Sequence, residues 1–257
     1  MLAPGVVFAR YRIAAAIERA AAGASQAWLA TDMQNGHEVV LEVLRDDATA
    51  RERSRFVARA RALVSVRHPA LVPLLESSEV ISGSQKRPYA TFAAVRGELL
   101  AENAGVAPAR ARQKLAWIAQ LAFALETLHA AGIVHGHVSL DEVVVQPDNT
   151  AKMHVPLGRD IAAAHFEDVR DLAMLAVVLV LGRDVPGEPT ASLAERFGRA
   201  GVPGDAAAVL AQIRSGAPIA SKDAARALEP FAHYRGPTTE PLAAPLSPSG
   251  NYRPPSR

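Results

Sequence analysis

The chain changes character at Gly97, and this change most limits the fold it can adopt. Before Gly97 the apolar residues form short, strand-like runs, two of which are separated by the hairpin dipeptide Asn35-Gly36. After Gly97 the apolar residues recur at helical spacing, first over residues 108–130. We therefore expect a small antiparallel sheet followed by a mostly helical part, which is an α+β arrangement.

One helix interrupts the strands of the first part. Over residues 51–66 the apolar residues recur at helical spacing with arginines off their stripe, and a His-Pro pair ends the pattern. The stripe consists of Phe56, Ala60, Leu63 and Val64. We expect residues 1–97 to form one lobe with about five strands and this one helix.

The second part, residues 98–233, is expected to be a helical lobe with an internal hairpin. Helices are predicted over residues 108–130, 168–181, 204–214 and 221–233, and the hairpin over 142–145 and 151–155. Residues 234–257 are rich in proline, serine and threonine, which predicts a disordered tail or a linker.

Composition excludes several classes of function. With 28 basic and 26 acidic side chains, the formal charge of +2 is too small to predict a nucleic-acid or membrane-surface partner. The absence of cysteine excludes disulfides, thiolate metal sites and a cysteine nucleophile. The longest apolar run, residues 172–181, falls short of the roughly 20 residues that span a bilayer, and the N-terminus lacks a secretory pattern. We expect a cytoplasmic chain, or the cytoplasmic part of a membrane-associated assembly.

Several segments, in family order, resemble bacterial serine/threonine protein kinases. They are PG and RYRI near the start, RFVARARALVSVRHPALV, LETLHAAGIVHGHVSLDEVVV and DVRDLAMLAVVLVLG. The resemblance extends over residues 4–231 and implies a two-lobed protein kinase-like fold, with a small antiparallel β lobe carrying one helix and a larger, mostly helical lobe. Only a short stretch separates Gly158 from Asp168, where the family carries a long activation segment, so a truncated activation segment is expected.

The resemblance places unusual residues at the phosphate-binding positions of the first lobe. The strand lysine falls on Glu42 and its helix glutamate partner on Arg59, and the first lysine of the chain is Lys86. The loop glycines fall on Ala20, Ala22 and Ser25, beside Gly23. We expect Glu42 and Arg59 to form an ion pair of reversed polarity. The alternative is that both are solvated surface charges.

The catalytic loop departs from the family pattern in the same way. The resemblance places the catalytic aspartate on His137, the loop lysine on Ser139, the metal-binding asparagine on Glu142, and the second metal-binding aspartate at Pro156 or its neighbour Val155. His135 and Asp168 keep their family positions and are assigned structural roles. Because phosphoryl transfer depends on the replaced groups, the sequence predicts a pseudokinase that is not an enzyme and holds neither Mg-ATP nor a metal.

Three other interpretations stay open. The fold could hold a nucleotide in another pose as an enzyme of altered chemistry. The cleft between the lobes could instead sense an uncharged small ligand against Val39, Phe92 and Val144. A metal cluster is less favoured, because no carboxylate that would orient the imidazoles is evident; its histidines would be His135, His137, His154 and His165.

The tail offers a candidate modification site. Thr238 and Thr239 precede Glu240, Pro241 and Leu242 in an extended, proline-rich stretch that an active kinase could reach. Forkhead-associated domains read phosphothreonine together with the residue three positions on, and the tail resembles those of actinobacterial pseudokinases in cell-wall regulation. The sequence thus predicts a signalling scaffold or regulatory protein-binding module whose partners are a forkhead-associated domain protein and an active serine/threonine kinase. A plain linker is the alternative.

Overall fold

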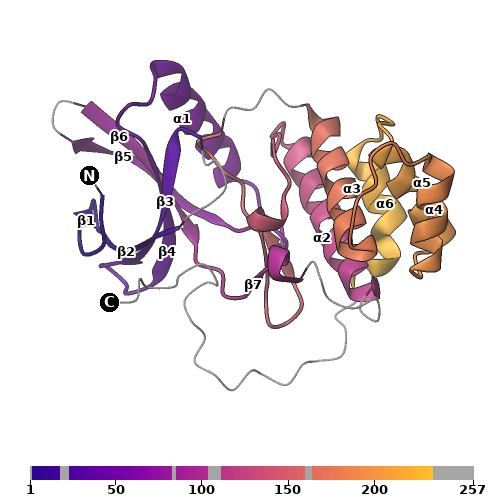
Figure 1. The fold of residues 1–257 in the computed structure, drawn as a ribbon. Coiled ribbons are helices and arrows are strands. Elements are labelled where there is room, and N and C mark those ends of the chain that lie inside the picture. Colours follow the sequence, from indigo (N-terminus) through magenta and orange to yellow (C-terminus); the bar gives the residue numbers. More distant parts are fainter. Residues whose placement is uncertain (1, 18–22, 83–84, 104–110, 160–163, 234–257) are drawn as a thin grey trace.

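The structure is a computed structural model that describes residues 2–17, 23–82, 85–103, 111–159 and 164–233. The predicted phosphorylation sites Thr238 and Thr239, like Ala20 and Ala22, lie outside the described residues. Two lobes lie side by side, one built on a sheet and one on helices (Figure 1). No helix in the described ranges combines the length and the apolar character that crossing a membrane requires.

The first lobe contains a six-stranded antiparallel sheet in the order β1-β2-β3-β4-β6-β5. Its strands are β1 (Val7–Phe8), β2 (Tyr11–Ile17), β3 (Ser25–Asp32), β4 (Glu38–Leu44), β5 (Leu74–Ser82) and β6 (Gln85–Ala93). The sequence predicts about five strands, and the additional strand is the two-residue β1, which is too short to carry an apolar pattern. The Asn35-Gly36 turn joins β3 to β4, and Gly36 has a φ of 75° as such a turn requires.

The single helix of this lobe, α1 (Ala50–Val64), packs against β5 and β6. It begins with a capping box, in which Thr49 and Glu52 each bind the other's backbone or side chain. Phe56, Ala60 and Leu63 are buried as predicted. Val64 is 41% exposed, because it is the last helical residue and lies past the end of the sheet-facing stripe.

The second lobe is built around α2 (Ala111–Ala130), a helix buried on most of its surface that contacts α3 (His165–Leu181) and α6 (Ser221–Ala232). The remaining helices are α4 (Thr190–Arg199) and α5 (Gly204–Arg214). A small three-stranded sheet, in the order β7-β8-β9, consists of β7 (Glu98–Leu99), β8 (Val143–Val145) and β9 (Ala151–Met153). Short 3₁₀ helices lie at Leu100–Asn103 and Leu140–Glu142.

One hydrophobic core runs through both lobes. It contains Phe56 and Phe92 from the sheet lobe together with Met153, Leu125 and Leu172 from the helical lobe. Backbone hydrogen bonds of 2.9 and 2.8 Å also join the segment 70–72 to Met153. Because apolar contacts and backbone hydrogen bonds both cross the boundary between the lobes, the two lobes are packed against each other.

Candidate functional site

A short loop, Val155–Gly158, follows β9 and lies between the two lobes; we call it the interlobe loop. Glu42 on β4 holds it, because one carboxylate oxygen, Oε1, accepts hydrogen bonds of 3.0 Å from the backbone N–H groups of both Leu157 and Gly158. The same oxygen accepts a 2.5 Å hydrogen bond from the Ser25 hydroxyl. Glu42 occupies the strand position that the resemblance assigns to a phosphate-binding lysine, and here this position binds the protein's own backbone.

The strand register explains how a glutamate fits at this buried place. Glu42 lies opposite Ala27 on β3 and Ala90 on β6, two small residues that leave room beside its side chain. Only 3% of Glu42 is exposed, and a carboxylate at such a depth requires donors. The N–H groups of the interlobe loop supply them.

Arg59 on α1 binds one carbonyl oxygen of the interlobe loop and one at His135. The guanidinium donates from Nε to the Pro156 oxygen and from Nη2 to the His135 oxygen, each at 2.9 Å. Burial lowers the pKa of Arg59 to about 10, although the negative charges of Glu42 and Asp168 oppose this shift. The expected ion pair between Glu42 and Arg59 is not formed, and neither residue is a solvated surface charge. Each instead satisfies backbone groups of the same loop.

Two glycines allow the interlobe loop to lie against the start of β3. The Gly158 oxygen accepts a 2.8 Å hydrogen bond from the Ala24 N–H. A Cβ atom added at Gly158 would lie 2.0 Å from the Ser25 hydroxyl, and one at Gly23 would lie 2.4 Å from the Gly158 oxygen. The close approach of backbone to backbone at this point therefore depends on both glycines.

The His154 ring lies near the second oxygen of Glu42, Oε2. The His154 ring lies between two carboxylates, with Nε2 3.9 Å from Glu42 and Nδ1 3.5 Å from Glu142, and Arg159 lies 3.6 Å from Glu142. The Phe92 ring covers His154 at a centroid distance of 4.5 Å. This site keeps its acidic residues beside a histidine and an arginine, as burial of carboxylates demands.

Asp168, in the first turn of α3, organises the predicted catalytic loop. Its carboxylate accepts hydrogen bonds of 2.7 Å from the N–H groups of His135 and Gly136 and one of 2.8 Å from His129. Burial alone would raise the pKa of Asp168, but these donors outweigh it and lower the pKa. The fully buried His135 donates to the His154 oxygen at 2.8 Å, and burial lowers its pKa to about 4, so its ring is neutral at pH 7.

The other positions suggested by sequence are only partly brought together. Pro156 belongs to the interlobe loop, and Glu142 lies beside His154, next to that loop; we call this region the interlobe site. Ser139 precedes the Leu140–Glu142 turn and is partly exposed. His137 is partly exposed too, and the next residue donates its N–H to Asp171 at 3.2 Å. Within the part of the chain that the structure describes, no cluster of three or more His, Cys, Asp or Glu side chains is arranged to hold a metal ion.

The proposed lining of a ligand-sensing cleft is not assembled. Val39 packs with Trp28 and Leu41 on one face of the sheet, while Phe92 belongs to the core on the other face. Side chains alternate along β4, so Val39 points away from the face that carries Glu42. Val39 and Phe92 therefore cannot line one cleft.

The two lobes, the interlobe loop between them and the Asp168-bound loop beside it define a protein kinase-like fold. Residues 19–169, more than half of the chain, match the family model of protein tyrosine and serine/threonine kinases. The chain therefore belongs to this family.

Individual relatives agree with this assignment. The chain is 27% identical over 183 residues to a probable serine/threonine-protein kinase of Corynebacterium efficiens, a match covering 69% of this chain and 26% of the relative. It is 32% identical over 149 residues to a DNA damage-responsive serine/threonine-protein kinase of Deinococcus radiodurans, covering 55% of this chain and 22% of that protein. The chain thus spans about a quarter of the length of these curated relatives.

A solved structure confirms the two-lobed fold. The crystal structure of the Mycobacterium tuberculosis PknI kinase domain superposes with a TM-score of 0.65 at 20% sequence identity, covering 90% of this chain and 99% of that one. The fold predicted from the order of the sequence segments is therefore correct.

The comparisons contradict the prediction that the chain is not an enzyme. Its relatives are named serine/threonine kinases, and the matching family model is that of protein kinases, which points to a kinase. The sequence argument relied on single replaced positions. Because phosphoryl transfer depends mostly on positioning and charge neutralisation, the loss of individual groups does not by itself establish the loss of activity.

Proposed function

We propose that this kinase-family chain acts in signalling as a regulatory protein-binding domain whose interlobe loop is held in one conformation by Glu42. One observation carries the proposal: Oε1 of Glu42 binds the N–H groups of Leu157 and Gly158 together with the hydroxyl of Ser25. A domain with a fixed interlobe arrangement presents a constant surface to a partner. We place this function in the cytoplasm or at the cytoplasmic part of a membrane-associated assembly.

Electrostatics supports a locked site. A unit negative charge placed about 4 Å from the Glu42 carboxylate is repelled by about 4 kcal/mol at an effective dielectric constant of about 20. The backbone N–H groups that could otherwise bind a phosphate are already bound to Glu42. A nucleoside triphosphate therefore has to displace Glu42 before its phosphates can bind these N–H groups.

Family membership favours a second candidate, an enzyme that binds nucleotide in an atypical pose. The match to kinase models and named kinases carries this candidate. Such an enzyme would release Glu42 from the interlobe loop and offer the freed N–H groups of Leu157 and Gly158 to a phosphate. Arg59, already bound to the same loop, is a nearby cation.

Nucleotide titration distinguishes the two candidates. Thermal unfolding of the chain is measured with and without millimolar Mg-ATP, and transfer of the labelled γ-phosphate to the chain and to a generic protein substrate is followed in parallel. The regulatory candidate predicts an unchanged melting temperature in the wild type, since only a ligand of the folded state stabilises it. Stabilisation by Mg-ATP together with label transfer contradicts an interlobe loop locked by Glu42 and supports the enzyme. Glu42→Gln, which removes the repelling charge, is measured in both assays, and the exposed Glu195→Gln is its matched control.

We further propose that the partner reads the tail. Phosphorylation of Thr238 or Thr239 by an active serine/threonine kinase would add charge and strong acceptors to a proline-rich sequence, a form that a forkhead-associated domain binds. The test is phosphorylation by such a kinase, mapping of the modified threonines and capture of a purified forkhead-associated domain. Replacing the threonine that the mapping identifies, by Thr239→Ala or Thr238→Ala, is expected to abolish capture, and the substitution of the other threonine is the control. If the unphosphorylated chain captures the forkhead-associated domain equally well, the partner does not read a phosphorylated tail.

A further inference from the structure

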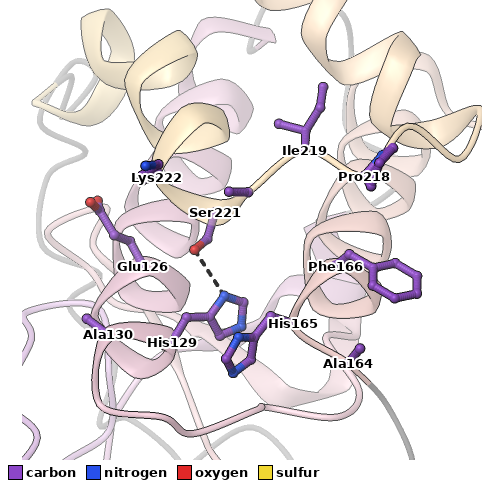
Figure 2. A pocket seen from close by; sticks show the side chains of 11 residues that line it. Glu126, His129, Ala130, Ala164, His165, Phe166, Pro218, Ile219, Ser221 and Lys222 are labelled. Atoms are coloured by element: carbon purple, nitrogen blue, oxygen red, sulfur yellow. Dashed lines mark hydrogen bonds between the residues drawn. The ribbon is translucent and has the colours of Figure 1, made fainter.

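A pocket of about 590 Å³ lies in the helical lobe, outside the interlobe site. It opens where the end of α2, the start of α3 and the segment before α6 meet, and Figure 2 shows its lining. Apolar walls come from Ala164, Phe166, Pro218 and Ile219. The polar side chains of the lining are Glu126, His129, His165, Ser221 and Lys222. Such a mixture of apolar walls and a few convergent polar groups is typical of small-molecule sites.

The polar groups at this pocket form a Ser–His–Asp chain. The Ser221 hydroxyl lies 3.0 Å from Nδ1 of His129, and Nε2 of His129 lies 2.8 Å from the Asp168 carboxylate. The three residues come from α6, α2 and α3, so their meeting depends on how the helices pack. Ser221 and His129 both line the pocket (Figure 2).

The hydrogen bonds fix which nitrogen of His129 carries the proton. The Asp168 carboxylate is ionised at neutral pH and can only accept, so Nε2 of His129 must donate to it. In the neutral imidazole, Nδ1 is then the unprotonated nitrogen and accepts from the Ser221 hydroxyl. The His165 ring stacks on His129 at a centroid distance of 4.3 Å and holds the imidazole plane. A serine beside an oriented imidazole base is the arrangement of an activated nucleophile.

Ser221 also begins a helix. It is the first residue of α6, and the N–H groups of Asp223 and Ala224 are bound to the Ala220 oxygen, so among the described hydrogen bonds the N–H of Lys222 stays available at the pocket rim. The residue after a nucleophile at a helix N-terminus is well placed to donate to a developing oxyanion. The helix dipole favours negative charge at the same point.

We propose that Ser221 is a nucleophile and His129 its general base, and that the pocket takes small carboxylic esters. The Ser221 oxygen bonds to the carbonyl carbon while its proton passes to Nδ1 of His129. The bond from that carbon to the alcohol oxygen then breaks, and the departing alkoxide takes the proton from His129. Water, activated by the same base, cleaves the acyl–serine ester and releases the acid. Asp168 is a positioning residue.

Fluorophosphonate labelling tests the nucleophile in the full chain. The probe is expected to modify Ser221, as mapped by mass spectrometry, and Ser221→Ala is expected to abolish labelling. Ser215→Ala is the matched control, since Ser215 bonds to a threonine hydroxyl and a backbone oxygen. His129→Gln is expected to slow labelling by at least about 100-fold, the usual loss on removal of a general base. Labelling of another residue, or none above that of the Ser221→Ala chain, overturns the proposal.

Turnover is tested separately with p-nitrophenyl acetate. The wild type is expected to release nitrophenol faster than Ser221→Ala, and equal rates would contradict ester hydrolysis. Because His129→Gln also removes a contact to Asp168, circular dichroism checks that this variant is folded. If it is not, Ser221→Cys replaces it: next to an intact His129 its thiol should react with iodoacetamide faster than free cysteine does, and a slower reaction overturns the assignment of the base.

Discussion

Glu42 and Arg59 hold the same loop through opposite kinds of group without pairing with each other. The carboxylate of Glu42 takes the N–H groups of Leu157 and Gly158, and the guanidinium of Arg59 takes the carbonyl oxygen of Pro156. Each charge therefore faces the end of the peptide dipole that it attracts. The interlobe loop is fixed by its backbone, which makes its position insensitive to the identity of most of its side chains.

This relationship predicts that exchanging the two charges does not restore stability. Glu42→Lys presents a cation to N–H groups, and Arg59→Glu presents an anion to carbonyl oxygens, so both contacts become repulsive. We expect each single variant to lower the free energy of unfolding by about 3 kcal/mol, the cost of leaving buried groups without their partner.

The double variant is the decisive measurement in this charge exchange. Chemical denaturation is expected to show that the double variant, Glu42→Lys with Arg59→Glu, has a free energy of unfolding no higher than that of the less stable single variant. A double variant that recovers most of the wild-type stability would mean that the two residues are coupled as an ion pair after all. The exposed pair Glu195 and Arg199, reversed together, is the control and should change stability by less than about 0.5 kcal/mol.

Gly158→Ala is expected to dislodge the interlobe loop from β3. The added Cβ would lie 2.0 Å from the hydroxyl and 2.5 Å from the Cβ of Ser25, so the loop or the strand must move. We expect the melting temperature to fall, with a loss of stability of about 2 kcal/mol from overpacking.

Gly198→Ala is the matched control for that substitution. Gly198 lies in α4, has no atom within 4 Å of an added Cβ and is exposed. Alanine in a helix should raise stability by about 0.5–1 kcal/mol. Equal melting temperatures for the two variants would show that the tight contact between Gly158 and Ser25 is not present in solution.

Particular residues show how far the sequence predicts this architecture. Helix α5 has the predicted bounds, Gly204–Arg214, because a run of alanine, leucine and isoleucine between a glycine and a Ser-Gly pair marks both ends. Helix α4 was not predicted, since only Leu193 and Phe197 of its residues are buried and they give a thin apolar stripe. The local pattern of apolar residues therefore predicts a helix only where the buried face of that helix is broad.

The candidate sites were beyond such reasoning for another reason. Glu42 binds N–H groups 115 and 116 residues further along the chain. No sequence pattern predicts how the backbone N–H groups of so distant a segment are oriented. The resemblance singled out Glu42 and Arg59 as unusual but paired them because the family pairs these two positions. Ser221 was missed because its histidine partner lies 92 residues away, and only the packing of α6 on α2 brings the two together.

Stability is expected to fall as the pH drops from about 6.5 to 4, since the pKa of His135 is lowered by burial to about 4. In this range the unfolded chain binds a proton at His135 and the folded chain does not, so acid favours unfolding. The contribution lost by pH 4 is about 3 kcal/mol, at 1.36 kcal/mol for each pKa unit. Denaturant unfolding at pH 7 and pH 5 measures the slope. His135→Gln should flatten it, and an unchanged slope would contradict a neutral buried His135.

Asp168→Asn and Asp171→Asn are expected to act differently although the residues lie one helical turn apart. Asp168 accepts from His129, His135 and Gly136, and its pKa is lowered, so its charge stabilises the fold above the unfolded pKa of about 3.9 and this support is lost in acid. Replacing it with asparagine at pH 7 should cost about 3 kcal/mol, because charge-assisted hydrogen bonds of about 1.5–3 kcal/mol each are weakened.

The pKa of Asp171 is raised, chiefly by burial, so folding disfavours its ionised form. A raised carboxyl pKa gives stability that is present in acid and lost as the pH rises, the reverse of Asp168. Asp171→Asn should therefore leave stability at pH 7 unchanged or slightly higher. Urea unfolding of both variants at pH 7 and pH 4 makes the comparison. Similar losses at pH 7 would show that Asp168 holds the loop at His135 no more firmly than Asp171 holds Val138.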